Sequence, residues 1–416
     1  GWGHIGLADC VRMPWAPLPQ ELKVHCWRLL SAGDVLTCSG SCRSDCAAVD
    51  AEELWAVLFH RDWRWLCADG PCARSTFRQS HRRLTEKAGS SRAAFVVLGG
   101  SVRRAGGRHK DGAVLSVLSA EKKVPEWRSY CGLPMASRCA AGICCKGGAD
   151  ASGSQLFVAG GFDFSEEEAL GSCEAINVLD LLAQRPAVQA CPSLQLPRAC
   201  PGLVAASEAV LAVGGGSSMF TAAEAFRSVE ILRPGAAKWL YGRPLQRPRC
   251  AAGVCVTSMG HVFAISGYAG NDRYEESVEW ADLGSSEGFL RGWSAGPSLS
   301  QARAGCAACF GPDGCVWVLG GGCDESASLD TVERLDPREG RWREVPPMPG
   351  RRRCFAASFG LDRKLYIYGG WNRERWHEDG AARLDLLSLR WEKLPSPEGE
   401  VNSIIPYHFV SGCTAL

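Results

Sequence analysis

Residues 316–321 read Val-Trp-Val-Leu-Gly-Gly, a run of four apolar residues followed by two glycines. Six copies of this pattern lie along the chain, with spacings of 61, 54, 52, 54 and 49 residues between successive copies. The copies are Phe95–Gly100, Leu156–Gly161, Val210–Gly215, Val262–Gly267, Val316–Gly321 and Leu365–Gly370, with Ser266 in place of the first glycine of the fourth. A period near 50 residues predicts an array of similar supersecondary units.

Each unit continues in the same way after the glycine pair. A second apolar strand follows a polar loop, as in Ser228–Leu232, Ser277–Trp280 and Thr331–Leu335. A tryptophan comes next in five units, at Trp127, Trp239, Trp293, Trp342 and Trp391, whereas the second unit has Val188 there. An arginine then precedes a strand of small residues, at Arg138, Arg198, Arg249, Arg303 and Arg353.

Four short strands cannot bury both faces of their own sheet, so neighbouring units must cover one another around an axis. The glycine pair, the Val-Glu strand and the tryptophan together resemble the Kelch repeat, over residues 93 to about 410. The resemblance implies a mainly β fold, a six-bladed Kelch-type β-propeller. A ring has no open edge only if the two ends of the chain pair. We expect Val401–Val410 to complete the first blade.

Residues 18–63 have a different, helical spacing of apolar residues, with Asp34 as a candidate N-cap. The pattern Leu18-Pro-Gln-Glu-Leu22, then Leu30, Asp34, Leu36, Cys42 and Arg43, resembles the F-box, although Asp45 occupies a position often held by tryptophan. The resemblance implies a small all-α module that binds a Skp-type adaptor and, through it, a cullin. The expected adaptor-binding residues are Leu18, Pro19, Leu22, Leu29, Leu30 and Leu36. An amphipathic bundle that only caps the propeller is the alternative.

The predicted organisation is therefore an N-terminal extension over 1–17, the F-box module over 18–63, a polar linker over 64–92 and the propeller over 93–416. The net charge of +1 gives no electrostatic attraction to nucleic acid or to a membrane surface. No apolar run is long enough for a membrane span, and residues 1–14 lack the pattern of a secretory signal. The chain starts with Gly, which is compatible with a fragment of a longer protein.

The chain has 22 cysteines, most of them inside apolar strand-like runs. Disulfide-dense proteins are usually small secreted domains, and free cysteine behaves as a small buried apolar residue. We therefore predict reduced cysteines and a cytoplasmic or nuclear protein. The pair Cys306 and Cys309 has zinc-ligand spacing, but a structural zinc site needs a second pair.

The sequence predicts a binding protein rather than an enzyme, with no metal and no cofactor. Copper-radical oxidases also use Kelch-like propellers, but the histidines of this chain's propeller have no ligand spacing; they are His109, His261, His377 and His408. The implied function is that of the substrate-recognition subunit of a Skp-cullin-F-box ubiquitin ligase, whose propeller binds an unidentified target protein. A Kelch scaffold without a ligase role is the alternative.

The loops after the glycine pairs differ most between units, and variable loops on a rigid scaffold commonly bind partners. The expected target-binding face combines the repeated arginines with aromatic residues of these loops, namely Arg138, Arg198, Arg249, Arg303, Arg353, Tyr268, Tyr274, Trp371 and Trp376. An arginine rim would suit an acidic peptide. The acidic segment Phe162–Glu168 would instead repel an acidic peptide. The alternative is that each arginine bonds backbone carbonyls within the fold.

Overall fold

The computed structural model describes residues 133–395 with short gaps, and it describes only the backbone of the strands between 94 and 130 and at 412–413. A compact unit of contacts spans Ser90–Phe310, Val316–Arg334 and Trp342–Leu416. The predicted F-box module and linker, and with them all six expected adaptor-binding residues, lie outside the described residues.

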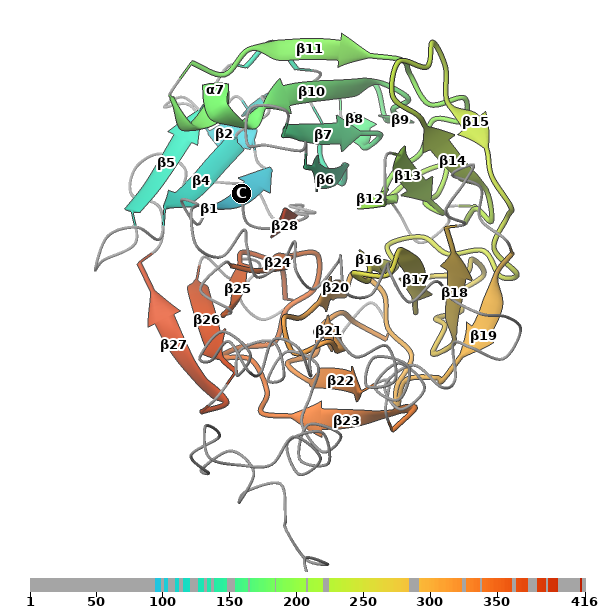
Figure 1. Cartoon of the computed structure of the whole chain (residues 1–416), viewed down its shortest axis with the longest axis vertical. Helices are drawn as coiled ribbons and strands as arrows, with labels where there is room; N and C mark the ends of the chain where they lie inside the picture. Colours follow the sequence, from blue (N-terminus) through green and yellow to red (C-terminus); the bar gives the residue numbers. More distant parts are fainter. Residues whose placement is uncertain are drawn as a thin grey trace, which may run out of the picture. The chain divides into compact units, whose positions relative to one another are not determined.

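The described strands form six four-stranded antiparallel sheets, each a candidate blade (Figure 1). Five sheets have described side chains, and four of these run in simple chain order from the inner to the outer strand. The first two of these sheets consist of β12 (Gly202–Ala206), β13 (Ala209–Val213), β14 (Val229–Leu232) and β15 (Leu240–Tyr241), and of β16 (Gly253–Val256), β17 (His261–Ile265), β18 (Val278–Asp282) and β19 (Ser294–Gly296). The third sheet consists of β20 (Ala307–Phe310), β21 (Val316–Leu319), β22 (Val332–Asp336) and β23 (Arg341–Val345). The fourth consists of β24 (Ala356–Phe359), β25 (Leu365–Tyr368), β26 (Ala381–Asp385) and β27 (Arg390–Leu394).

The fifth of these sheets carries two insertions. It has the order β6 (Gly142–Lys146), β7 (Gln155–Ala159), β10 (Cys173–Asn177) and β11 (Val188–Cys191). A hairpin of β8 (Phe162–Asp163) and β9 (Glu168–Ala169) follows β7, and a short helix, α7 (Val178–Leu182), follows β10. The helix was not predicted; it buries Leu181 in the apolar cluster of this blade.

The remaining four-stranded sheet joins the two ends of the propeller sequence. Its order is β28 (Gly412–Cys413), β1 (Ala94–Leu98), β4 (Leu115–Ser119) and β5 (Glu126–Tyr130), and Val96 and Val97 of β1 face Cys413 and Gly412. A hairpin of β2 (Ser101–Arg103) and β3 (His109–Asp111) accompanies it. The pairing strand lies just beyond Val401–Val410, the segment expected from sequence, which is outside the described residues.

The innermost strands contact one another in turn, in the order β6, β12, β16, β20, β24, β28 and back to β6. A chain of backbone hydrogen bonds joins the described blades beside this axis. Cys200 N donates to Ala140 O, Ala251 N to Cys200 O, Gly305 N to Ala251 O, and Cys354 N to Gly305 O, at 2.7–3.2 Å. All five residues have a left-handed φ of 50–65°, at equivalent positions just before each inner strand. The prediction of a mainly β, Kelch-type propeller is confirmed at this level.

The glycine pair is required by close backbone approach between blades. Gly214 has φ +61°, and a Cβ there would collide with the carbonyl oxygen of Arg249 from the next blade. Ser266 replaces glycine at the equivalent position, also with φ +61°. Its hydroxyl donates toward the carbonyls of Glu275 and Arg303 and accepts from Arg303 N at 3.0 Å. The serine at this position therefore adds a buried polar link to the next blade.

The repeated tryptophan fills the space between blades, as predicted. Trp239 is fully buried among residues of both the β6–β11 and β12–β15 blades. Its indole Nε1 donates to the Pro192 carbonyl in the loop leaving the previous blade, at 2.7 Å. The same bond recurs from Trp293 to Arg243, from Trp342 to Pro297 and from Trp391 to Pro346, at 2.9, 2.8 and 3.2 Å.

This packing predicts a graded effect of removing the indole. Trp239→Ala should lower the free energy of unfolding by about 3–5 kcal/mol, because it leaves a cavity between two blades. Trp391→Ala, at the equivalent but partly exposed position, is the matched control and should cost clearly less. Urea unfolding of both variants measures the difference, and equal losses would contradict the interblade role of Trp239.

Candidate protein-binding face

One buried arginine stands before the inner strand of each described blade. Its guanidinium donates to the carbonyl of the first residue of the glycine pair, and in four blades it also pairs with the glutamate of the Val-Glu strand or its equivalent. The ion pairs are Arg138–Glu174, Arg198–Glu230, Arg249–Glu279 and Arg303–Glu333, at 2.5–3.0 Å. The arginine therefore connects the start of the first strand to the end of the second strand and to the beginning of the third.

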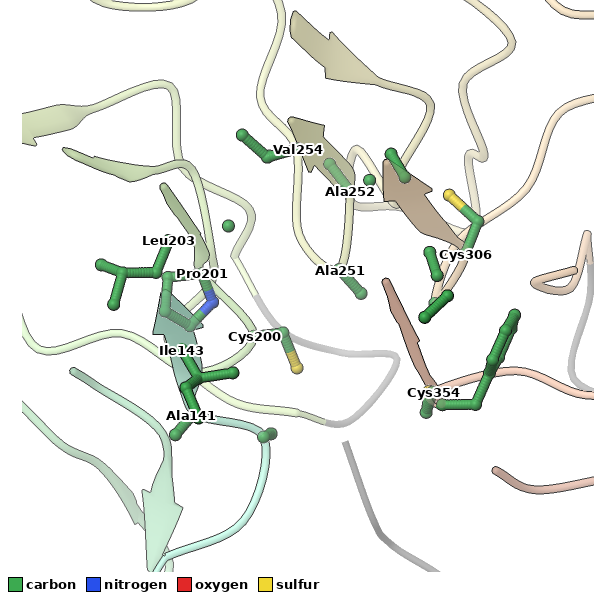
Figure 2. Close-up of a pocket in the computed structure, with 18 residues that line it drawn as sticks. Ala141, Ile143, Cys200, Pro201, Leu203, Ala251, Ala252, Val254, Cys306 and Cys354 are labelled. Carbon is green, nitrogen blue, oxygen red and sulfur yellow. The ribbon is translucent and has the colours of Figure 1, made fainter. Parts of the chain in front are cut away.

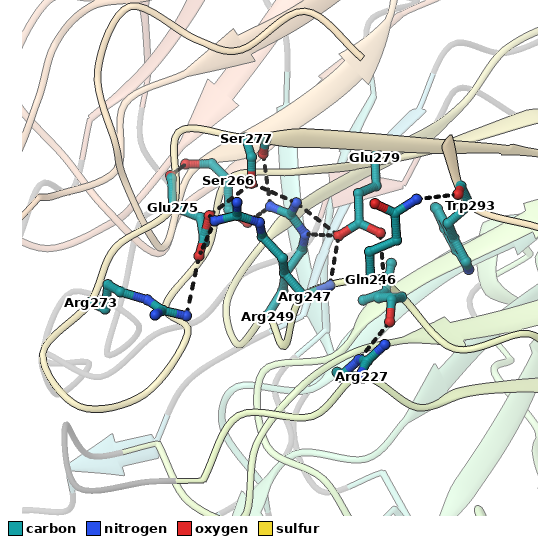
Figure 3. A network of polar contacts seen from close by, with 11 residues as sticks. Arg227, Gln246, Arg247, Arg249, Ser266, Arg273, Glu275, Ser277, Glu279 and Trp293 are labelled. Carbon is teal, nitrogen blue, oxygen red and sulfur yellow. Dashed lines mark hydrogen bonds and ion pairs between the residues drawn. The ribbon is translucent and has the colours of Figure 1, made fainter. Parts of the chain in front are cut away.

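Figure 3 shows this arrangement in the β16–β19 blade. Arg249 Nη1 donates to the carbonyls of Ser266 and Ser277 at 2.7 and 2.8 Å, and Nη2 donates to Glu279 Oε1 at 3.0 Å. Glu279 also accepts from the backbone N–H groups of Gln246 and Arg247, in the loop arriving from the previous blade, at 2.6 and 3.1 Å. Burial lowers the pKa of the Arg249 guanidinium, and the charge of Glu279 opposes that shift.

These arginines are not a docking surface. Arg198, Arg249 and Arg303 are completely buried and Arg138 is 6% exposed, so the proposed target-binding role of these four is wrong and the structural interpretation holds. A charge removed from water must be paired and fully hydrogen-bonded, and each guanidinium is enclosed by its own blade.

The fifth assignment was off by one residue, because the buried arginine of the last blade is Arg352 and not Arg353. Arg352 donates to the carbonyls of Gly369 and Gly380 at 2.9 and 3.0 Å, and Ala382 occupies the glutamate position. Sequence spacing does not separate the two candidates. The arginine precedes the first residue of the glycine pair by 17 residues at Arg249 and Arg303, but by 16 at Arg198 and by 22 at Arg138.

The residue after each buried arginine forms a β-bridge with the residue after the glycine pair. These bridges place the segments of the expected binding face at one end of the blades. The bridges are Cys139 with Phe162, Ala199 with Gly216, Cys250 with Tyr268, Ala304 with Gly322 and Arg353 with Trp371. Members from four blades form one apolar cluster that includes Phe162 and Tyr268. Both are buried, so Tyr268 is part of the platform and not an exposed contact as expected.

Three of the predicted residues remain accessible on this face. Tyr274 packs edge-on against Tyr268, with ring centroids 5.5 Å apart, and is partly exposed. Arg353 lies over the Trp371 ring, 4.7 Å from its centroid, and donates to Ala327 O at 2.9 Å; both Arg353 and Trp371 are partly exposed. Trp376 is outside the described residues.

Two further arginines that sequence analysis did not select extend the basic character of the face. Arg247 and Arg273 both contact the buried carboxylate of Glu275, at 2.9 and 3.6 Å, while their side chains are 57% and 65% exposed (Figure 3). They lie outside the repeat register, so periodicity gave no reason to choose them. By contrast, the segment 165–168 beside the β8–β9 hairpin is exposed and carries three glutamates.

The centre of the described blades holds a cavity of about 120 Å³ lined by small and apolar residues (Figure 2). Ile143, Cys200, Val254, Cys306 and Cys354 line it, from five inner strands or the residues before them. Burial raises the pKa of the Cys306 and Cys354 thiols. Among the described residues, no three His, Cys, Asp or Glu side chains are placed to hold a metal ion, and no helix could span a membrane.

Comparison with known proteins supports a Kelch-repeat protein. The family model for the Kelch motif matches residues 302–349, which span the end of one interblade loop and the β20–β23 blade. The solved structure of YjhT is similar in fold, with a TM-score of 0.56 and 13% sequence identity, and the match covers 71% of this chain and 97% of that one. No curated protein matches the chain.

The buried ion pairs predict a large and position-dependent effect on stability. Arg249→Ala should lower the free energy of unfolding by about 3–5 kcal/mol, because Glu279 would remain buried without its cation. Arg273→Ala on the same blade removes an exposed cation 3.6 Å from Glu275 and leaves Glu275 paired with Arg247, so it should change the free energy of unfolding by about 1 kcal/mol or less. Chemical denaturation measures both, and a mild effect of Arg249→Ala would refute the structural role.

Proposed function

We propose that this protein is the substrate-recognition subunit of a Skp-cullin-F-box ubiquitin ligase, in which the propeller binds a target protein. The observation that carries the binding half is that accessible arginine and aromatic side chains lie on this face, as Arg353 over Trp371 on one blade and Tyr274 against the buried Tyr268 on another. Tryptophan, tyrosine and arginine are the residue types enriched at binding hot spots.

The ring we propose has six blades, with the β28–β1–β4–β5 sheet as the first and closing blade. Pairing of β1 with β28 and contacts of β28 with both β24 and β6 support this count. Closure would leave no inner strand edge open and would make the scaffold rigid enough to present its loops.

The ligase half of the proposal depends on the resemblance of residues 18–63 to the F-box. The family comparison matches a Kelch motif and does not detect an F-box. In this role the protein supplies no catalytic residue and raises the local concentration of its target beside the ubiquitin-carrying enzyme. The free cysteines of the described part of the chain suit a cytoplasmic or nuclear location.

The adaptor-binding half is tested by co-purification of the intact chain with a Skp-type adaptor. We expect complex formation, and we expect it to be lost in a Leu18→Asp/Leu22→Asp variant, because a charge on an apolar docking surface must be desolvated. A known F-box protein serves as the positive control. If the intact chain does not bind while the control does, the ligase role fails and a Kelch scaffold without ligase function is favoured.

The docking face is tested with a pair of surface variants. Proteins cross-linked to the wild-type chain in cells should be lost with Arg353→Ala/Trp371→Ala and retained with Tyr241→Ala, which alters a 54% exposed tyrosine on an outer strand. Losing one hot-spot contact typically costs about 2 kcal/mol or more of binding free energy. Melting temperatures of both variants should stay near that of the wild type. Loss of partners only with Tyr241→Ala would place docking elsewhere.

A further inference from the structure

Two cysteines face each other across the outer strands of the β6–β11 blade. Cys173 of β10 and Cys191 of β11 are direct partners in the antiparallel register. Directly opposed residues in such a ladder have Cα atoms roughly 4.5–5.5 Å apart, within the range of about 4.4–6.8 Å seen in disulfides. Both cysteines are free. Joining the two sulfurs therefore requires little movement of the backbone.

The two thiols differ in access. Cys173 is 2% exposed, in the apolar cluster that surrounds Trp239, whereas Cys191 is half-buried at the end of the outer strand. Interaction with the Cys173 thiol lowers the pKa of Cys191, and the same interaction raises the pKa of Cys173. A reagent in solution would therefore meet Cys191 first, and Cys191 is also the thiol more readily ionised.

The pair is particular to this blade. The equivalent cross-strand positions hold Val278 with Gly296 in the β16–β19 blade and Ala381 with Leu394 in the β24–β27 blade. Those blades have the same strand order without sulfur at this place. The fold therefore does not require two thiols here.

We propose that Cys191 and Cys173 are a thiol modification site, at which Cys191 attacks and Cys173 resolves, with a low-molecular-weight disulfide such as oxidised glutathione as the oxidant. The Cys191 thiolate attacks one sulfur of oxidised glutathione, forming a mixed disulfide and releasing one glutathione thiolate. Cys173 then gives up its proton to solvent, and its sulfur attacks Cys191 Sγ. The second glutathione thiolate leaves and takes up a proton. Two protein thiols are oxidised and one glutathione disulfide is reduced to two thiols.

The position of the pair gives the modification a structural consequence. Cys191 directly precedes Pro192, whose carbonyl accepts the Trp239 indole, and the same loop continues to Gln195 and Leu196, whose N–H groups donate to Glu230. A bond between Cys191 and Cys173 would fix the start of this interblade loop to its own blade. The oxidised protein should therefore melt at a higher temperature than the reduced one.

The test uses the full chain incubated with oxidised glutathione, quenched with acid, alkylated and cleaved after glutamate. Cleavage after Glu174 separates the two cysteines, so an internal disulfide appears as a linked pair of peptides. We expect this linked pair in the wild type, reversed by excess reduced glutathione. Cys173→Ser should instead accumulate the glutathione adduct on Cys191, because the resolving thiol is gone. Cys191→Ser should leave Cys173 unmodified, since Cys173 is buried.

Cys323, another half-buried thiol, is the internal control and should react more slowly than Cys191. Circular dichroism of each variant verifies the fold before reaction. The proposal is overturned if Cys191 reacts no faster than Cys323, or if the wild type keeps the glutathione adduct without forming the linked pair. Neither outcome depends on adaptor or target binding.

Discussion

The buried guanidinium inside each blade is the constraint on which the propeller depends. A cation in the interior is tolerated when its donors find acceptors; in four blades a carboxylate also lies beside it, whereas Arg352 bonds the carbonyls of Gly369 and Gly380. Arg198 meets this condition with the carbonyls of Gly214 and Ser228 and the carboxylate of Glu230. Those partners lie at the end of β13 and at the start of β14, so the arginine is satisfied only when the three inner strands are assembled. The charge therefore favours the assembled three strands over partly formed ones.

The same groups connect one blade to the next. Glu230 accepts hydrogen bonds from the backbone N–H groups of Gln195 and Leu196, in the loop that connects the preceding blade to this one. Trp239 donates to the carbonyl of Pro192, earlier in the same loop. Beside the axis, residues with left-handed φ pass a backbone hydrogen bond from blade to blade. Close approach at these places excludes a side chain at Gly214, while Ser266 is accepted because its hydroxyl bonds to the neighbouring backbone. Intrablade and interblade contacts thus share residues, and the array behaves as one packed unit.

Burial of the repeated arginines determines which basic groups are accessible on the candidate binding face. Since the repeated arginines are buried inside the blades, the accessible basic groups are Arg353, which stands at a repeat position held by small residues elsewhere, and Arg247 and Arg273, which lie outside the repeat register. Arg353 differs from its equivalents, Ala199, Cys250 and Ala304, which are small and belong to the buried platform. Arg247 and Arg273 reach Glu275 from two segments of a single blade. The face is therefore asymmetric among the described blades, with basic groups on some and the glutamates of 165–168 on another.

The sequence by itself determined the propeller, because recurrence of the glycine pair, the Val-Glu strand and the tryptophan is a local pattern with a physical cause in every unit. It also located the arginine of four blades, but the spacing to the glycine pair varies between 16, 17 and 22 residues and does not choose between Arg352 and Arg353 in the fifth. Tertiary structure alone decided what those residues do. Burial of Arg249 and pairing with Glu279, 30 residues away, depend on how strands fold against each other, which periodicity does not reveal. Exposure of Arg353 over Trp371, and the opposition of Cys173 to Cys191, likewise follow from register between strands. Residue type and spacing therefore specify the repeated scaffold, while the surface chemistry arises where the chain departs from the repeat.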